Sequence, residues 1–180
     1  MTGSFTGAGG RKIPCALTRG DCRLAGVGVT RVGYAARGWG VGELWLDHGR
    51  VLEIDHPRPR RAAGGSHLLA ERLTAWFAGS RDDFADVELE LDWCTPFQHA
   101  LVDALRAVPY GETVTYGELA ALAGRPGAAR AAGALCATNR FAVLVPCHRV
   151  VAAGGIGGYG ALGLVYKRRL LALEHQSATL

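Results

Sequence analysis

A thiol, an imidazole and a guanidinium stand side by side at Cys147, His148 and Arg149, directly after Pro146. A cysteine attacks as its thiolate, and at an ordinary pKa of about 8.5 only a few per cent of a thiol is ionised at neutral pH. A base is therefore needed, and His148 is the candidate. Adjacent side chains point in different directions, so we expect a water molecule to bridge the two groups.

A catalytic imidazole also needs a group that fixes its orientation. After Cys147 the sequence contains a single acidic residue, Glu174, inside a segment that predicts a helix over 165–176. The alternative is a surface carboxylate near a helix end, where negative charge is unfavourable. We assign Glu174 as the partner of His148.

The segments on either side of the thiol predict how it is presented. The apolar run FAVLVP (141–146) is interpreted as a short buried strand that ends at Cys147. The glycine-rich segment 153–163 is expected to fold over the thiol as a flexible lid.

The chain has five cysteines, an odd number, and no C-x-x-C pair, which argues against a disulfide framework and against common zinc spacings. The cysteines other than Cys147 are interpreted as small buried hydrophobes: Cys15, Cys22, Cys94 and Cys136. A zinc site on Cys15, Cys22 and two of the six histidines is an open alternative, but no metal is predicted.

Length and composition, with 180 residues of which 49% are hydrophobic and 20% charged, predict a globular protein. The opening MTGSFTGAGG lacks the apolar core of a signal peptide, and no run of eighteen apolar residues occurs, so we expect a cytoplasmic protein without membrane contact. Residues 93–180 carry 8 Lys and Arg against 4 Asp and Glu, whereas residues 1–92 carry 12 of each. This excess fits either a solvated surface or a footprint for a phosphate backbone.

The first half predicts a small α/β unit with an antiparallel sheet. A hairpin is expected over 42–55, a helix over 68–77, and a strand with one wet face over 87–93, where apolar and acidic residues alternate. No catalytic residue is predicted in this half.

The second half predicts helices. Residues 95–98 and 115–118 both have the pattern of a capping box, and Gly124 is expected to stop the second helix. After a glycine-containing turn, 128–138 predicts a short helix of small residues. Helix, short turn and helix together outline a helix-turn-helix.

The small-residue helix has one long side chain, Arg130, among Ala131, Ala134 and Ala137. The same alanines would suit a tight helix contact in the core. An unpaired arginine in such a contact is costly, so we interpret this surface as the face that approaches a partner.

Several motifs, in their order along the chain, resemble the family of 6-O-alkylguanine-DNA alkyltransferases, also called methylated-DNA–protein-cysteine methyltransferases. The resemblance is close over about 93–180 and loose over 38–55 and 73–84. It implies an α+β protein with a ribonuclease H-like α/β domain over 1–92 and a mostly helical DNA-binding domain over 93–180. The motifs that carry it are PYGETVTYGELA (109–120), GRPGAARAAG (124–133), Asn139, PCHRV (146–150), GGYG (157–160) and KRRLLALE (167–174).

The resemblance implies a monomeric DNA repair protein without cofactor or metal. Its partner is double-stranded DNA that contains an alkylated guanine. The protein would bind this DNA through the helix-turn-helix, turn the damaged guanine out of the stack and transfer the alkyl group to Cys147. A thioether is not hydrolysed, so each molecule would act once. The choice between guanine and 4-O-alkylthymine lesions, and the preferred alkyl group, stay open.

The resemblance also assigns roles to single residues. Cys147 is the acceptor, His148 the base that acts through water, and Glu174 its partner, in agreement with the assignment made from the residues themselves. Tyr116 turns the target phosphate and donates a hydrogen bond to the base, and Arg130 fills the space that the base leaves.

The remaining implied contacts concern DNA and the pocket. Ala131 and Ala134 lie in the groove, and Asn139 links the recognition helix to the cysteine turn. Independently of the resemblance, Arg149 adds positive charge beside the thiol and is taken as a DNA-binding residue. Cys136, Tyr159 and Gly160 line the pocket, and the backbone carbonyls of Cys147 and Val150 read the guanine amino group. The chain departs from the family pattern at Val102, Cys136 and Gly160, where relatives often carry a tryptophan, a longer apolar residue and a hydroxyl.

Three other functions are compatible with parts of the sequence. A thiol hydrolase would use Cys147 and His148, but it gives the helix-turn-helix no role. A protein that binds damaged bases without repairing them would not need Cys147. A transcription regulator would explain the helix-turn-helix alone.

Overall fold

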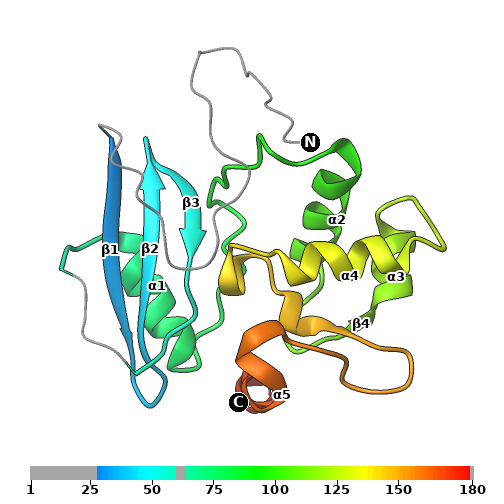
Figure 1. The fold of residues 1–180 in the computed structure, drawn as a ribbon. Coiled ribbons are helices and arrows are strands. Elements are labelled where there is room, and N and C mark those ends of the chain that lie inside the picture. The colour runs from blue at the N-terminus through cyan, green and yellow to red at the C-terminus, as the bar shows by residue number, and fades with distance from the viewer. Residues whose placement is uncertain (1–27, 60–63, 179–180) are drawn as a thin grey trace.

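The computed structural model describes residues 28–59 and 64–178. The mixed α/β class expected from the sequence is confirmed: a three-stranded sheet with one helix lies beside a group of helices (Figure 1). No helix in the described ranges is long and apolar enough to cross a lipid bilayer. The division into domains at residue 92 stays a prediction.

The sheet is an antiparallel meander of β1 (Val29–Ala36), β2 (Gly40–Asp47) and β3 (Arg50–Ile54). The predicted hairpin joins β2 to β3, and His48 and Gly49 both have positive φ at its tip, as a two-residue turn that matches strand twist requires. Strand β1 was not predicted. Helix α1 (Leu68–Phe77) packs on the sheet through Leu73, Trp76 and Phe77.

The strand expected over 87–93 is wrong. Only Leu89 pairs, in a single bridge to Val51, whose N–H and C=O bond Glu88 and Glu90. Beyond this point the chain turns: the Cys94 N–H donates to the Leu91 carbonyl at 2.8 Å, and the Trp93 indole N–H donates to the carbonyl of Glu90. The alternation therefore reflects one buried side of an extended segment at a sheet edge.

The helical half begins with α2 (Pro96–Arg106), which is followed by β4 (Val114–Thr115), α3 (Tyr116–Leu122) and α4 (Ala129–Ala137). Both predicted capping boxes are present: Thr95 with Gln98, and Thr115 with Glu118. Gly124, at φ +80°, stops α3 as expected. Helices α3 and α4 pack against each other in the predicted helix-turn-helix arrangement.

The strand expected over 141–146 is also wrong, although the segment is fully buried. It forms a 3-10 turn, η1 (Ala142–Leu144), with the Leu144 N–H donating to the Phe141 carbonyl at 2.8 Å. A short apolar run does not distinguish a buried strand from a buried turn. The chain continues through η2 (Cys147–Arg149), β5 (Val150–Val151), which pairs in parallel with β4, η3 (Gly160–Leu162) and α5 (Gly163–Ala178).

Candidate active site

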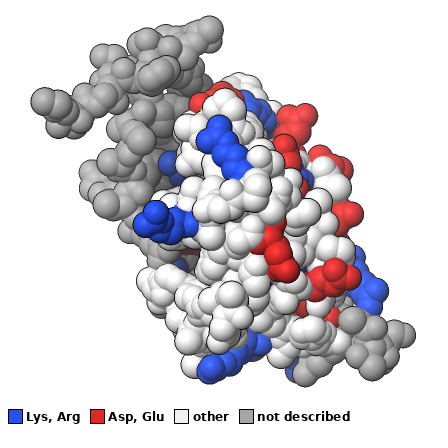
Figure 2. Space-filling view, turned by 90° about the vertical axis from the view of Figure 1, so that its right-hand side faces the viewer, with Lys and Arg blue, Asp and Glu red and all other residues white. Residues whose placement is uncertain are grey.

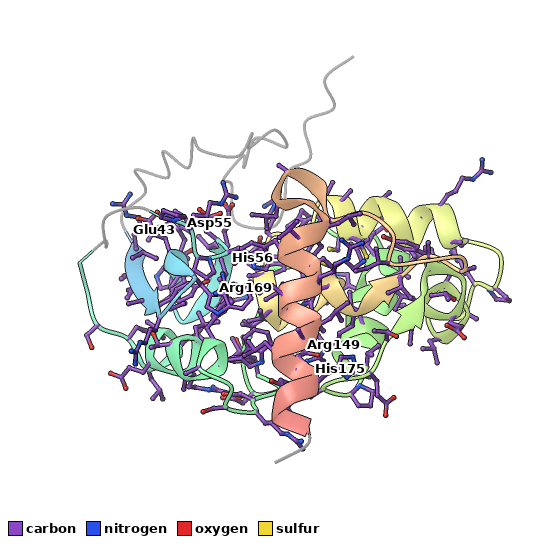
Figure 3. All side chains as sticks on the ribbon, turned by 90° about the horizontal axis from the view of Figure 1, so that it is seen from below. Glu43, Asp55, His56, Arg149, Arg169 and His175 are labelled. Carbon is purple, nitrogen blue, oxygen red and sulfur yellow. The ribbon has the colours of Figure 1, made fainter. Side chains whose placement is uncertain are left out.

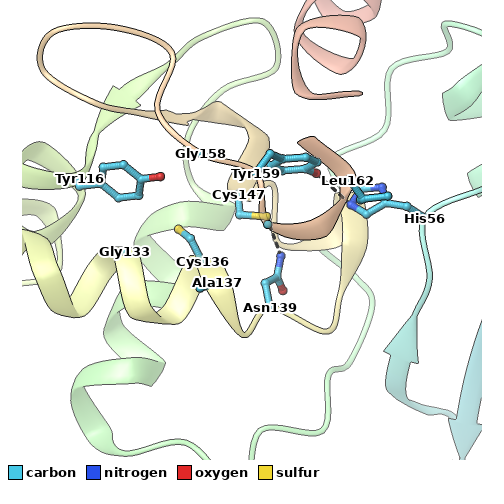
Figure 4. A pocket seen from close by; sticks show the side chains of 11 residues that line it. His56, Tyr116, Gly133, Cys136, Ala137, Asn139, Cys147, Gly158, Tyr159 and Leu162 are labelled. Carbon is cyan, nitrogen blue, oxygen red and sulfur yellow. Dashed lines mark hydrogen bonds between the residues drawn. The ribbon is translucent and has the colours of Figure 1, made fainter. Parts of the chain in front are cut away.

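Cys147 is the first residue of the 3-10 turn η2, and it lines a cavity of about 170 Å³ (Figure 4). The residue is buried, with 8% of its surface exposed. Six of the residues expected at the site line this one cavity: Tyr116, Cys136, Asn139, Cys147, Tyr159 and Gly160. Residues from α3, α4, η2 and the glycine-rich loop therefore converge on the thiol.

Asn139 ties the end of α4 to the cysteine turn. Its Nδ2 donates to Cys147 Sγ at 3.2 Å and to the Val145 carbonyl at 2.7 Å, and its Oδ1 accepts from the Phe141 N–H at 3.0 Å. The side chain thereby fixes the position of the sulfur relative to α4, as the resemblance implied for this residue.

The thiol is not ionised in the protein alone. Burial raises the pKa of Cys147, and this outweighs the hydrogen bonds from Asn139 and Tyr159 and the nearby charge of Lys167, which act in the opposite direction. Burial likewise lowers the pKa of His148 against the effect of Glu174, so the imidazole is neutral at physiological pH and able to accept a proton.

His148 and Glu174 meet as expected, both fully buried. His148 Nε2 lies 2.8 Å from Glu174 Oε1, and Nδ1 has no hydrogen-bond partner among the described residues. Although burial alone would raise it, hydrogen bonds from His148 and Arg149 lower the pKa of Glu174 to about 2. The ionised carboxylate accepts the Nε2 proton, which leaves the Nδ1 lone pair to act as base.

The placement of Arg149 corrects our expectation. Its guanidinium does not face the pocket or the surface; it is buried, bonds both oxygens of Glu174 at 2.8–3.2 Å, and donates to the Val108 carbonyl at 2.7 Å. The Gly111 N–H also donates to Glu174 at 3.0 Å. Arg149 therefore neutralises the buried carboxylate, because an unpaired charge there would be costly.

Two polar side chains of the pocket stay protonated. Burial raises the pKa of Tyr116, so its phenol is a hydrogen-bond donor, and its hydroxyl points toward the cavity in Figure 4. Burial also raises the pKa of Cys136 to about 12. Cys136 and Cys94 are half-buried free thiols rather than fully buried ones.

Helix α4 exposes the face that we expected to meet a partner. Arg130, Ala131 and Ala134 are exposed, whereas Ala132 and Leu135 are buried against the neighbouring helices. The core-contact alternative is thus wrong for these alanines. The side of the molecule that carries α3 and α4 is mostly uncharged, with both basic and acidic side chains scattered over it (Figure 2).

Nothing in the sequence indicated a role at the site for Lys167 or for His56. Lys167 is fully buried, and its Nζ donates to the carbonyls of Val150, Ile156 and Gly158 at 2.5–3.3 Å, which ties down the glycine-rich loop expected to be a flexible lid. Lysine in a helix ordinarily indicates an exposed position, so no local pattern marked it. His56 reaches the cavity from the sheet half, where no site residue was predicted.

Val150 lies behind the pocket. It is fully buried, and its carbonyl already accepts from Lys167, while the Cys147 carbonyl accepts from the Val150 N–H. Reading of a guanine amino group by either oxygen would use its second lone pair. Among the described residues no cluster of three or more His, Cys, Asp or Glu side chains could hold a metal ion, and Cys15 and Cys22 lie outside those residues.

Comparisons with known proteins agree with this site. Residues 96–176 match the family model described as "6-O-methylguanine DNA methyltransferase, DNA binding domain". The methylated-DNA–protein-cysteine methyltransferase of Mycolicibacterium paratuberculosis is 48% identical over 125 residues, which cover 68% of this chain and 72% of the relative.

Solved structures extend the likeness to the sheet half. The crystal structure of Mycobacterium tuberculosis OGT in complex with DNA has a TM-score of 0.68 and 35% identity, covering 82% of this chain and 93% of that one. The O6-methylguanine-DNA methyltransferase from Pyrococcus kodakaraensis has a TM-score of 0.62 and 26% identity, covering 81% and 98%. Cys147 lines the cavity, and the buried His148–Glu174 pair begins at the next residue. On the identities and coverages above, this chain belongs to the family of methylated-DNA–protein-cysteine methyltransferases.

Proposed function

We propose that this protein repairs DNA by moving the alkyl group from O6 of a guanine in double-stranded DNA to Sγ of Cys147. One observation carries the proposal: the cavity that holds Cys147 is partly walled by α4, and the same helix exposes Arg130 and small residues to solvent. A reactive sulfur lies next to a surface on which a nucleic-acid groove fits.

The DNA must deliver its base into the cavity. The short side chains of Ala131 and Ala134 let the backbone of α4 approach a groove closely, and Arg130 is long enough to enter the stack from this face. Turning a base out costs a few kcal/mol of stacking, roughly, which contacts of this kind offset. A damaged base is easier to extrude because its pairing is already weakened.

The transfer is a displacement at the alkyl carbon. Cys147 passes its proton through a bridging water to Nδ1 of His148, and Glu174 stabilises the imidazolium that forms. The thiolate then bonds the alkyl carbon while the bond from this carbon to O6 breaks, and its electron pair moves into the guanine ring. Tyr116 donates a hydrogen bond to a ring nitrogen, which stabilises the departing base.

The product is a thioether, which water does not cleave, so each molecule reacts once. In the same proposal the protein acts as a monomer in the cytoplasm, and light scattering of the protein with and without DNA tests the monomer.

The test is to incubate the protein with a duplex that contains 6-O-methylguanine and to determine the mass of the intact protein and its peptides. We expect one added methyl group, located on the peptide of Cys147. Cys147→Ser should abolish the transfer, whereas Cys94→Ser, at a thiol outside the cavity, should leave it unchanged. Repaired DNA beside unmodified protein, or methyl groups on other cysteines, would contradict the proposal.

A further inference from the structure

His56 belongs to the sheet half and lies beside α5 (Figure 3), and it lines the cavity of Cys147 (Figure 4). It follows β3, and its Nε2 lies 2.9 Å from the hydroxyl oxygen of Tyr159. Its ring meets the rings of Tyr159 and Tyr166 edge to face, with centroids 5.6 and 5.2 Å apart. The imidazole is therefore held against the wall of the reactive pocket.

The position of His56 is fixed by contacts between the sheet half and α5. The Tyr166 hydroxyl donates to the Pro57 carbonyl at 3.1 Å, directly beside His56 in the chain. Farther along α5, Arg169 lies over the Trp39 ring at 3.7 Å and donates to the Gly38 carbonyl at 2.6 Å. Movement of His56 away from the pocket would break this interface.

The hydroxyl of Tyr159 has one proton and two neighbours that could receive it. Tyr159 is nearly buried, and besides its bond to His56 it interacts with the Cys147 thiol. If Tyr159 donated to His56, its proton would be unavailable to the sulfur. If His56 donates from Nε2, Tyr159 accepts that bond with its oxygen and directs its own proton to Cys147.

We propose that His56 is a positioning residue for the alkyl transfer: its Nε2–H donates to Tyr159, so that Tyr159 donates its only proton to the Cys147 thiolate as it forms. The inference rests on the proposed role of Cys147. It gives the sheet half a part in the chemistry, because it sets the direction of a hydrogen bond at the reacting sulfur.

Several aromatic and charged groups surround His56. Tyr159 from the glycine-rich loop and Tyr166 from α5 face it, and burial raises the pKa of both phenols. Arg58, and Arg169 on α5, place positive charge near Tyr166. Asp55 precedes His56 on its own segment.

The test compares His56→Leu, which removes the donor, with His56→Gln, whose amide N–H restores it. Two quantities are measured: the single-turnover rate of methyl transfer at saturating duplex, and the pKa of the Cys147 thiol from the pH dependence of its alkylation by iodoacetamide. The loss of one hydrogen bond to a charged sulfur predicts a rate about tenfold lower and a thiol pKa about one unit higher in His56→Leu. His56→Gln should recover most of both.

Two controls separate this role from a structural one. The dissociation constant for the duplex should be the same in His56→Leu and the unmodified protein, and His48→Asn, on the exposed hairpin, should change nothing. In the background of Tyr159→Phe, His56→Leu should have no further effect on the rate, because His56 acts through that hydroxyl.

An unchanged thiol pKa and rate in His56→Leu, or an equal further loss in the Tyr159→Phe background, would overturn the inference. If the unmodified protein transfers no methyl group to Cys147, the proposed function fails instead, and the two failures are thereby distinguishable.

Discussion

Two regions next to Cys147, the buried residues behind the thiol and the exposed side of α4, differ in whether their polar side chains have partners within the protein. Behind the thiol, His148, Arg149 and Glu174 are buried and bond one another and the backbone. On the outer side of α4, Arg130 and Ala134 are exposed, and no ion pair holds Arg130 among the residues that the structure describes. The side chains of the first region bond to one another, whereas those of the second region are exposed and free to contact a binding partner.

This difference has an energetic meaning. Buried charges need partners, so each group behind the thiol contributes to the fold and to the chemistry together. Exposed small residues contribute little to stability, so substitutions on the outer face of α4 can change binding with little effect on the free energy of unfolding. Substitutions in the two regions should therefore separate into different classes of effect.

The largest effect is expected from Glu174→Gln, which leaves the Arg149 guanidinium buried without its counter-charge. Breaking such a pair costs about 3–5 kcal/mol of the free energy of unfolding, as measured by urea denaturation. The matched control Glu112→Gln, at an exposed carboxylate, should change it by less than about 0.5 kcal/mol. Equal stability of the two variants would show that the buried network is not structural.

Acid should weaken the same network. The folded protein holds the pKa of Glu174 at about 2 rather than 4.5, so its stabilisation is complete above pH 4.5 and is lost as the pH falls toward 2. This corresponds to about 3 kcal/mol. The pKa of His148 is also lowered in the folded protein. As the pH falls below about 6.5, the unfolded chain therefore binds a proton at this histidine before the folded protein does, which further lowers the free energy of unfolding. Urea midpoints between pH 7 and 3 measure the loss, which should be smaller in Glu174→Gln.

On the exposed face, Arg130→Ala should separate DNA handling from stability. We expect methyl transfer from duplex DNA to slow about tenfold or more, because loss of the contacts that offset unstacking costs a kcal/mol or more. Urea unfolding should change by less than about 0.5 kcal/mol. Arg168→Ala, which removes the same charge from an exposed position on α5, is the control. A similar loss of rate in both variants would mean that Arg130 acts through its contribution to the net charge and not through its location on α4.

The smallest effect concerns the inner side of α4, where Gly133 lines the cavity. An added Cβ would lie 3.9 Å from the Tyr116 ring, an ordinary contact, so Gly133→Ala should stabilise the helix by about 0.5–1 kcal/mol. Gly124→Ala, at φ +80° with open space around it, should destabilise by about the same amount. Thermal unfolding measures both changes in stability. If the two substitutions changed the stability in the same direction, the different backbone roles given to Gly133 and Gly124 would be contradicted.

The helical half was the more predictable part of the fold. The capping boxes at Thr95 and Thr115 and the stop at Gly124 are local signals, because each depends on residues within four positions. The pairing of His148 with Glu174 was also predictable, since only one carboxylate follows the thiol in sequence. The two wrongly predicted strands, 87–93 and 141–146, depend on neighbours that the local pattern does not contain.

By itself, the sequence determined which atoms could react: a thiol beside a base, a small-residue helix with one arginine, and the family to which these belong. Only the tertiary structure decided that Arg149 turns inward, that Lys167 holds a loop, and that His56 reaches the pocket from the other half of the chain. Reactivity resides in a residue type and its immediate neighbours. Burial and long-range partners follow from how distant segments pack, and they set the pKa and the orientation of each group.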